Sequence, residues 1–291
     1  MARDDARETA PRPRRARRVR LDAELVAQGL FADADAAMRA ILAGSVSCEG
    51  RRLEHPGDLV RQGAPLHVRS GRRYVSRGGL KLEGALRSFG LDPRGMRCLD
   101  VGCSTGGFTD CLLQAGAESV SAVDVGRAQF AWGLRNDPRV RLFENTNICD
   151  ADPAALGAPF DLAVADVSFT SVERILDAVC AALGPRGTLC TLVKPQFEAA
   201  RDEVDEGGVV RDPQVHRRVL RDAVEAIGRG PLAVRGLCVS PIHGAKGNVE
   251  FFLLARRGDD ALPVDVDAVV DRAWAGAATG TSEVVGRASE G

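Results

Sequence analysis

The sequence lacks the features that would assign it to several large classes of protein. Its 291 residues contain no apolar run of the roughly 18 residues that a membrane-spanning helix needs. The arginine-rich start also lacks the apolar segment and small-residue cleavage site of a secretory signal. The eight cysteines include no CxxC pair and the four histidines are isolated from one another, which argues against a metal site. We therefore expect a cytoplasmic protein with no membrane partner and no metal, whose cysteines are small core residues.

Lysine is also scarce. Only Lys81, Lys194 and Lys246 occur among 39 basic residues, which leaves 36 arginines. Because arginine supplies positive charge everywhere else, each lysine raises the question of whether an ammonium group, which titrates more readily, is needed at that position. We interpret Lys246, in the loop sequence HGAKGN, as a residue that is able to contact a phosphate.

The net charge of −1 conceals an uneven distribution. Residues 1–78 hold 16 arginines against 10 aspartates and glutamates, a charge of +6, so the remainder carries −7. A basic module on an acidic body indicates that one end of the protein meets a polyanion, with phosphate contacts supplying the attraction. Residues 1–18 are expected to form a basic flexible tail.

Residues 19–73 are predicted to form a small α+β domain. The stretch FADADAAMRAILAG places Ala37, Ile41 and Leu42 on one helix face and ends at Gly44, a typical residue after a helix end. Short β-prone runs follow, broken by Glu-Gly, Pro-Gly and Gln-Gly as in small hairpins. With RLDAELVAQGL before it and PGDLVRQG after it, this segment resembles the S4 RNA-binding domain.

The resemblance to the S4 domain implies that basic side chains of the helix pair and the hairpin contact structured RNA. Taken singly, Arg39 and Arg51 are explained nearly as well as ordinary surface arginines. The candidate RNA-binding residues are Arg18, Arg20, Arg39, Arg51, Arg52, Arg72 and Arg73.

Strand-like and helix-like segments alternate from Met96 onward. The apolar runs RCLDVG, SVSAVDVG, FDLAVADVSF and TLCTLVKPQF are separated by helical stretches such as 109–115 and 172–183, and LAVRGLCVSP and NVEFFLLAR follow. Asp212-Pro213 predicts a helix start, with proline at the first helical position. For residues 74–257 this alternation predicts an α/β, Rossmann-like fold: a doubly wound, mostly parallel sheet with helices on both faces. Residues 258–291 are expected to form an acidic, largely flexible tail with one short helix at most.

The first predicted strand ends in the glycine-rich sequence LDVGCSTGGFTD. Its glycines let the backbone turn tightly and approach a ligand at the start of a helix. Ser104 breaks the strict GxGxxG fingerprint of dinucleotide sites, whereas Asp100 and the GxxxGG spacing fit a methyl-donor site better. The second strand ends at Asp124, whose carboxylate is able to bind both hydroxyls of a ribose.

These features together favour S-adenosylmethionine as the cofactor, lying across the carboxyl ends of the strands at the switch point of the sheet. The alternative is a different nucleotide in the same crevice. Asn147 and Ile148, in ENTNICD, stand where this fold usually meets the adenine. The predicted cofactor-binding residues are Asp100, Gly102, Cys103, Ser104, Thr105, Gly106, Gly107, Phe108, Asp124, Asn147, Ile148 and Asp166.

The later strands carry groups suited to methylating a hydroxyl. Asp166 follows the fourth strand, Lys194 follows the fifth, Glu250 lies in the last, and Lys81 precedes the first. The strand end AVADVSF lacks the Asn/Asp-Pro-Pro-aromatic motif of amine methylation, and no Pro-Cys dipeptide offers a cytosine C5 nucleophile. A ribose 2'-hydroxyl must be held in line with the methyl–sulfonium bond and relieved of its proton, a task that suits a lysine beside other positive charge.

The segments SRGGLKL, DVGCSTGGFT, ADVSF, LVKPQFE and GNVEFFLL resemble those of the FtsJ-like ribose methyltransferases. Together with the S4-like start, they resemble the TlyA family of ribosomal RNA cytidine-2'-O-methyltransferases, which are often labelled hemolysins. The resemblance implies a catalytic tetrad in which Lys194 acts on the 2'-hydroxyl, Asp166 and Lys81 orient it and balance charge, and Glu250 fixes Lys194 or the ribose. It also implies ribosomal RNA or ribosomal subunits as partners, and no particular oligomeric state.

Two other functions stay open at this point. A non-catalytic RNA-binding or ribosome assembly factor could use the same fold, although it would not need Lys194 and Asp166. A membrane-lytic activity, suggested by the hemolysin label, would call for a spanning or strongly amphipathic apolar helix, which the sequence does not show. The stretch EAARDEVDEGGVVRD is compatible with a mobile lid and with a plain exposed loop alike.

Overall fold

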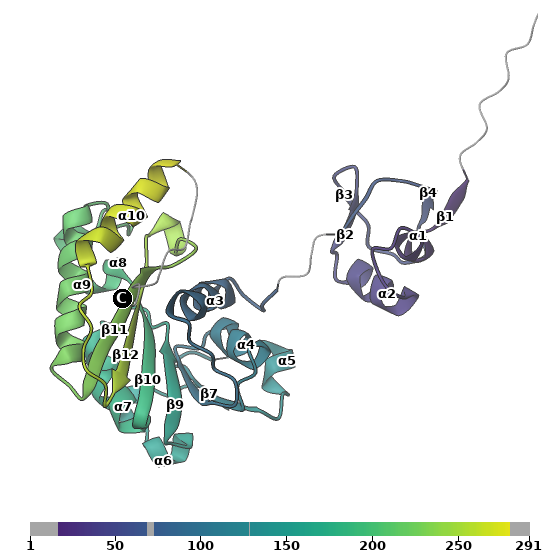
Figure 1. Ribbon diagram of the computed structural model, residues 1–291. Coiled ribbons are helices and arrows are strands. Elements are labelled where there is room, and N and C mark those ends of the chain that lie inside the picture. Colours follow the sequence, from purple (N-terminus) through teal and green to yellow (C-terminus); the bar gives the residue numbers. More distant parts are fainter. Residues whose placement is uncertain (1–16, 69–72, 128, 280–291) are drawn as a thin grey trace, which may run out of the picture. The chain divides into compact units, whose positions relative to one another are not determined.

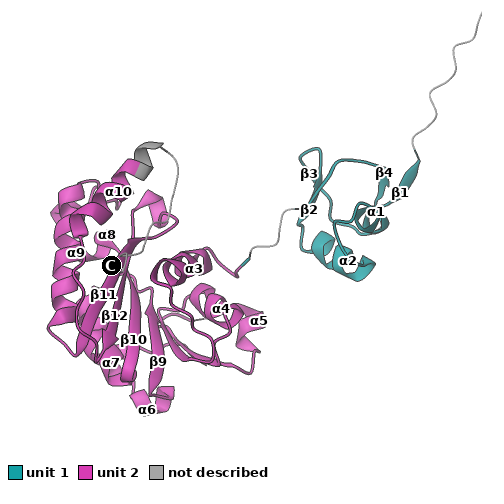
Figure 2. Cartoon of the chain, viewed as in Figure 1, with its two compact units in different colours: residues 1–73 teal, residues 74–291 magenta. Residues whose placement is uncertain are grey.

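The chain divides into two compact units, residues 1–73 and residues 74–291 (Figure 2). The computed structural model describes residues 17–68, 73–127 and 129–279. The N-terminal unit has one hydrophobic core, and the larger unit has two. The two units are therefore described separately.

The N-terminal unit contains the two short helices and the short strands that its sequence predicts. Helix α2 begins where the Asp33 side chain accepts a hydrogen bond from the backbone N–H of Ala36, a standard N-cap. Ala37 and Ile41 are fully buried, but Leu42, expected on the same face, is 66% exposed at the helix end. The elements are β1 (Arg18–Arg20), α1 (Leu21–Ala27), α2 (Ala34–Leu42), β2 (Val46–Cys48), β3 (Arg51–Arg52), β4 (Leu59–Arg61) and β5 (Leu66–Val68).

The larger unit is built on a seven-stranded sheet with the order β11-β12-β10-β9-β6-β7-β8 (Figure 1). Five neighbouring strands, from β10 to β8, run parallel, and β12 is antiparallel to both β10 and β11. The direction of winding reverses between β6 and β9, which leaves a crevice at the carboxyl ends of these strands. The strands are β6 (Arg97–Val101), β7 (Ser119–Val123), β8 (Val140–Phe143), β9 (Phe160–Ala165), β10 (Leu183–Val193), β11 (Leu232–Val239) and β12 (Phe251–Arg257).

Helices cover both faces of this sheet, so the predicted α/β fold is confirmed. Residues along β6 alternate between the two cores: Leu99 and Val101 pack with α7, α9 and α10, while Cys98 packs with α3, α4 and α5. Burial also raises the pKa of the Cys98 thiol to about 12, as expected of a core cysteine. The helices are α3 (Gly78–Phe89), α4 (Gly107–Gln114), α5 (Trp132–Arg135), α6 (Pro153–Leu156), α7 (Val172–Ala182), α8 (Pro195–Glu198), α9 (Pro213–Gly228) and α10 (Val266–Thr279), with short 3-10 turns η1 (Ile148–Asp150), η2 (Arg201–Glu203) and η3 (Ala245–Gly247).

Helix α10 lies beyond the predicted domain boundary at Arg257 and corrects it. Val269 and Val270 are buried in the core shared with α9 and β11. The indole N–H of Trp274 donates a 3.2 Å hydrogen bond to Nδ1 of the buried His216 on α9. The expectation of a largely flexible tail is therefore wrong for α10, because its apolar residues repeat at helical spacing and find a partner; residues 280–291 lie outside the described residues.

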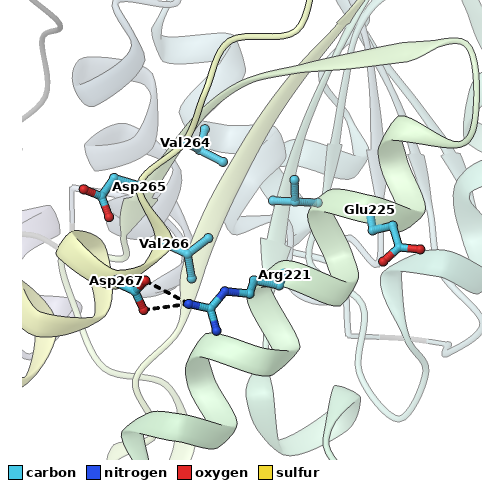
Figure 3. Close-up of a pocket in the computed structure, with 7 residues that line it drawn as sticks. Arg221, Glu225, Val264, Asp265, Val266 and Asp267 are labelled. Atoms are coloured by element: carbon cyan, nitrogen blue, oxygen red, sulfur yellow. Dashed lines mark hydrogen bonds and ion pairs between the residues drawn. The ribbon is translucent and has the colours of Figure 1, made fainter.

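A groove of about 490 Å³ separates parts of α9 from the segment that leads into α10 (Figure 3). Arg221 of α9 reaches Asp267 of α10 across it, with two contacts of 2.8 Å. Both partners are more than half exposed, so solvent screening keeps the contribution of this pair small. The docking of α10 rests on the buried apolar contacts instead.

Across the described ranges, no helix combines the length and the apolar character that crossing a membrane would take.

Candidate active site

A cavity of about 610 Å³ lies at the carboxyl ends of β6, β7 and β9. Gly102, Asp124 and Asp166, which directly follow these three strands, line it together with Asn147 and Ile148 at turn η1. The position is the point at which the strand order reverses, and the size is that of a site for a small molecule. Of the predicted cofactor-binding residues, those that line the cavity are Gly102, Ser104, Asp124, Asn147, Ile148 and Asp166.

The loop after β6 packs so closely against the end of β9 that only glycine fits at its first position. Gly102 has a φ of +80°, and a Cβ atom there would lie 2.7 Å from the carbonyl oxygen of Asp166. Two residues on, the backbone N–H of Ser104 donates to Asp124 Oδ2 at 2.7 Å, and that of Gly126 donates to Oδ1 at 2.6 Å. Each carboxylate oxygen keeps a second lone pair, so Asp124 is held in place and is still able to accept hydroxyls of a ligand.

The remaining residues of the glycine-rich segment do not line this cavity. Cys103 borders a smaller hollow beside Asp124, and the carbonyl of Thr105 accepts a hydrogen bond from the N–H of Ala131. Gly106 and Gly107 allow close packing, because a Cβ atom would meet Leu134 at the first and Ser76 at the second. Phe108 is 3% exposed, and its ring stacks on that of Phe252 at 6.1 Å. The start of α4 packs against α3 and α5, and the part of these five residues in cofactor binding stays a prediction.

Asp100, the last predicted cofactor residue, is fully buried beside the cavity-lining Val101. Its Oδ2 accepts a 2.6 Å hydrogen bond from the hydroxyl of Thr109, but its Oδ1 finds no partner among the described residues. Burial, together with the nearby carboxylates of Asp166 and Asp124, raises the pKa of Asp100 to about 7. An unpartnered carboxylate oxygen beside two further aspartates makes this end of the sheet suited to a ligand that carries positive charge.

Lys194 and Asp166 form an ion pair at the ends of two neighbouring parallel strands. Ala165 of β9 is in register with Thr191 of β10, so the residues that follow both strands come together. Lys194 Nζ lies 2.5 Å from Asp166 Oδ1 and donates a 2.9 Å hydrogen bond to the hydroxyl of Ser168. The lysine is 8% exposed. Parallel register therefore brings a nearly buried ammonium group next to the cavity.

Lys81 and Glu250 form a second ion pair from elements far apart in the sequence. Lys81 Nζ, from α3, lies 2.5 Å from Glu250 Oε2, just before β12, and Glu250 is 2% exposed. The side-chain amide of Gln196 on α8 donates to Glu250 Oε1 at 3.4 Å. Because Gln196 is two residues from Lys194, the two ion pairs share one site. The structure thus brings together all four predicted catalytic residues, with balanced charge.

The sequence analysis missed three uncharged residues that surround these pairs, namely Ser168, Phe169 and Gln196. Phe169 is 90% exposed, has a φ of +62°, and its ring lies 5.0 Å from that of Phe197. A positive φ on a bulky aromatic residue is strained and marks sites of function more often than ordinary loops. Their positions could have indicated a role in the site, because Ser168 and Phe169 end the ADVSF segment and Gln196 lies two residues after Lys194 in LVKPQFE.

The arginines predicted to bind RNA lie on the N-terminal unit, and all of those described are exposed. Arg20 is paired at 2.5 Å with Asp22, an interaction that lowers the pKa of that carboxyl, so part of its charge is already neutralised. Arg52 lies 3.3 Å from Glu54. Arg72 lies outside the described residues. The exposed set comprises Arg18, Arg20, Arg39, Arg51, Arg52 and Arg73.

Comparison with known proteins connects this geometry to a known chemistry. Residues 74–257 match the model of the FtsJ-like methyltransferase family. The chain is 46% identical over 248 residues to the 16S/23S rRNA (cytidine-2'-O)-methyltransferase TlyA of Mycobacterium tuberculosis, an overlap of 84% of this chain and 92% of that protein. It is 38% identical over 234 residues to hemolysin A of Brachyspira hyodysenteriae, covering 80% and 98%. A solved structure named as a hemolysin, from Streptococcus thermophilus, superposes with a TM-score of 0.68 at 39% identity, covering 90% and 98%.

Proposed function

Because this chain belongs to the FtsJ-like methyltransferase family, we propose that it transfers the methyl group of S-adenosylmethionine to a ribose 2'-hydroxyl of ribosomal RNA, at a cytidine. The relative that is 46% identical and named as an rRNA (cytidine-2'-O)-methyltransferase supports this substrate. The observation that carries the proposal is the convergence of the Lys194–Asp166 and Lys81–Glu250 ion pairs beside a cavity of cofactor size.

The residues around the cavity fit S-adenosylmethionine. When bound, this cofactor supplies an electrophilic methyl group on a positively charged sulfur. Asp124 would accept the hydroxyls of its ribose, and Asn147 and Ile148 would contact its adenine. The orphaned oxygen of Asp100 and the carboxylate of Asp166 would offset its positive charge. A neutral cofactor would leave the buried carboxyl of Asp100 without such compensation.

The tetrad would act by positioning the 2'-oxygen and removing its proton. Lys194, in its neutral form, would receive the proton as the oxygen attacks, a role that typically contributes about 10²- to 10⁴-fold in rate. Asp166 holds Nζ of Lys194 within 2.5 Å. The Lys81–Glu250 pair is nearly buried and electrically balanced, so it would orient the ribose without adding net charge. A protein that only bound RNA would gain nothing from two ion pairs removed from solvent.

Recognition of the RNA would involve both units. Unpaired bases commonly stack on aromatic side chains, and the ring of Phe169 stands exposed beside the cavity. The exposed arginines of the N-terminal unit, with its two helices and short strands, support an S4-like role in binding ribosomal RNA or an assembled ribosomal subunit in the cytoplasm. The phosphate contacts would supply affinity, and the larger unit would perform the chemistry.

The decisive experiment measures transfer of a labelled methyl group from S-adenosylmethionine to unmodified ribosomal subunits and to their naked RNAs, followed by nucleoside mapping. The wild type should label a ribose 2'-oxygen, and Lys194→Ala should lose at least 100-fold in kcat. Lys246→Ala, the lysine outside the tetrad, is the matched control and should keep its kcat. Cofactor binding by the wild type without transfer to either subunit would contradict the proposal.

A further inference from the structure

The directed hydrogen bond of the Lys194 ammonium goes to a serine. Nζ donates to Ser168 Oγ at 2.9 Å. Asp166 Oδ1 lies closer still, at 2.5 Å, and is the charged partner of the ammonium. Because an ammonium group has three N–H donors, the carboxylate and the hydroxyl hold Lys194 from two directions. Removing the Ser168 hydroxyl would take away one of these two contacts and leave the ion pair in place.

Ser168 also connects Lys194 to water. Lys194 is 8% exposed, whereas Ser168 is an exposed residue that lines the cavity in the loop between β9 and α7. A hydroxyl accepts one proton while it donates another. The serine is thus a polar link between a nearly buried amine and the solvent.

On the basis of the proposed 2'-O-methylation, we propose that Ser168 is a positioning residue that orients Lys194 and returns its proton to the solvent. Before the reaction, the Lys194 ammonium gives one proton to Ser168 Oγ as that hydroxyl gives its own proton to water, which leaves a neutral amine. The 2'-oxygen then forms a bond to the methyl carbon, the carbon–sulfur bond breaks, and the 2'-proton passes to this amine. Lys194 ends as the ammonium that it was at the start, and Ser168 is unchanged, so the cycle can repeat.

The charged groups near Lys194 come from several elements of the fold. Asp166 stands at the end of β9 and is the direct partner. Lys81 of α3 and Glu250 before β12 form the neighbouring ion pair, which Gln196 joins to the turn of Lys194 itself. Replacing the serine leaves all of these groups in place. A change in the titration of Lys194 in such a variant therefore reports the lost hydroxyl.

The first test is NMR of protein labelled with ¹³C and ¹⁵N at lysine, which is practical because the chain has three lysines. Removing an acceptor from an ammonium favours its neutral form, so in Ser168→Ala the Lys194 signal should titrate lower by about one pH unit. Ser168→Thr keeps the hydroxyl and should restore the wild-type titration. Ser171→Ala is the matched control, because this serine in the same loop forms no side-chain cap on α7.

The second test is the pH profile of methyl transfer. Ser168→Ala should lower kcat about 10-fold, leave KM for RNA and cofactor within about twofold, and move the acidic limb of kcat toward lower pH. Ser168→Thr should recover most of kcat. A variant with wild-type kcat and an unshifted Lys194 signal would overturn the inference, as would a loss of kcat that threonine does not restore.

The two tests separate the inference from the function on which it rests. The NMR titration needs neither RNA nor cofactor. A shifted Lys194 signal in a protein that transfers no methyl group would overturn the proposed function and with it the proton transfer. An unshifted signal in an active enzyme that depends on Lys194 would overturn the role of Ser168 alone.

Discussion

At the scale of single residues, the site depends on contacts that leave no room for an added atom. The backbone at Gly244 passes directly over the carboxylate of Glu250, at a φ that any residue could adopt. The requirement at this position is therefore one of space rather than of backbone conformation. A methyl group added here would meet the Glu250 carboxylate first, because the three atoms nearest to its position all belong to that side chain.

Gly244→Ala should displace the Glu250 carboxylate from Lys81 and lower kcat by about 10²-fold while the protein stays folded, since misplacement by about 1 Å has that effect. Gly133→Ala is the matched control, because a Cβ atom at this glycine meets nothing within 4 Å. Methyl transfer and thermal unfolding of both variants check the prediction. Equal rates in the two variants would show that Glu250 is not positioned as described.

The raised pKa of Asp100 predicts how stability varies with pH. A carboxyl with a pKa of about 7 in the folded protein and about 4 when unfolded holds its proton more strongly when folded. The contribution of Asp100 to the free energy of unfolding is therefore largest below pH 4 and falls as the pH rises to 7, at no more than about 1.4 kcal/mol per pH unit. Urea unfolding should show this fall in the wild type and a smaller one in Asp100→Asn. Parallel pH profiles would exclude Asp100 as its source.

At the scale of helices and strands, the ends of elements place the proposed catalytic groups. Helix α7 begins after the loop that carries Asp166 and Ser168, and its first N–H, from Val172, donates to Glu198 Oε1 at 2.8 Å. Glu198 ends α8, the turn that starts at Lys194. One carboxylate thus joins the two loops that hold the Lys194–Asp166 pair.

Glu198→Ala should lower the free energy of unfolding by about 1 kcal/mol, the usual effect of removing a helix cap, and should also lower kcat. Asp212→Ala removes the cap of α9, where Asp212 accepts from the N–H of Gln214, and should cost similar stability without changing kcat. Urea unfolding and methyl transfer distinguish the two variants. A normal kcat in Glu198→Ala would mean that the two loops are held by other contacts.

Most elements were predictable, because their signals are local. The apolar runs gave six of the seven strands, and Asp212-Pro213 marked the start of α9 where the structure has it. Strand β8 was missed because Val140–Phe143 is short and mostly half-buried. The charged members of the site were predictable from their motifs. The contacts of Ser168 with Lys194 and of Gln196 with Glu250 were not predictable from the sequence, because the partner of a neutral polar side chain depends on the tertiary fold.

At the scale of the whole molecule, the two units have separate cores, and the boundary falls where the second core begins. Tyr74 is 5% exposed and belongs to the core of the larger unit, where it lies against Gly79 at the start of α3. A fragment that is meant to fold alone must therefore keep Tyr74. Cutting the chain before Tyr74 should then separate the unit proposed to bind RNA from the unit proposed to bind the cofactor and transfer the methyl group.

A fragment of residues 73–291 should fold and bind S-adenosylmethionine as the full chain does, but should methylate RNA poorly because it lacks most of the arginines predicted to bind RNA. The dependence of RNA affinity on salt should weaken as well, since fewer phosphate contacts release fewer counterions. Calorimetric cofactor titration and RNA binding at several salt concentrations test this. Full activity of the fragment would argue against an RNA-binding role for the N-terminal unit.

The sheet order also sets when the enzyme becomes active during its own synthesis. Strand β12 inserts between β10 and β11 although it is the last strand made. Glu250, just before it, follows its partner Lys81 by 169 residues, which at ordinary ribosomal speeds of about 5–20 residues per second is roughly 10–30 s of translation. A nascent chain therefore carries the glycine-rich loop, the cavity and Lys194 before it carries a complete tetrad. Under the proposed function, an enzyme that methylates ribosomal RNA would thus emerge beside the ribosome in an inactive form, and its activity would begin only once the chain is long enough to complete the sheet.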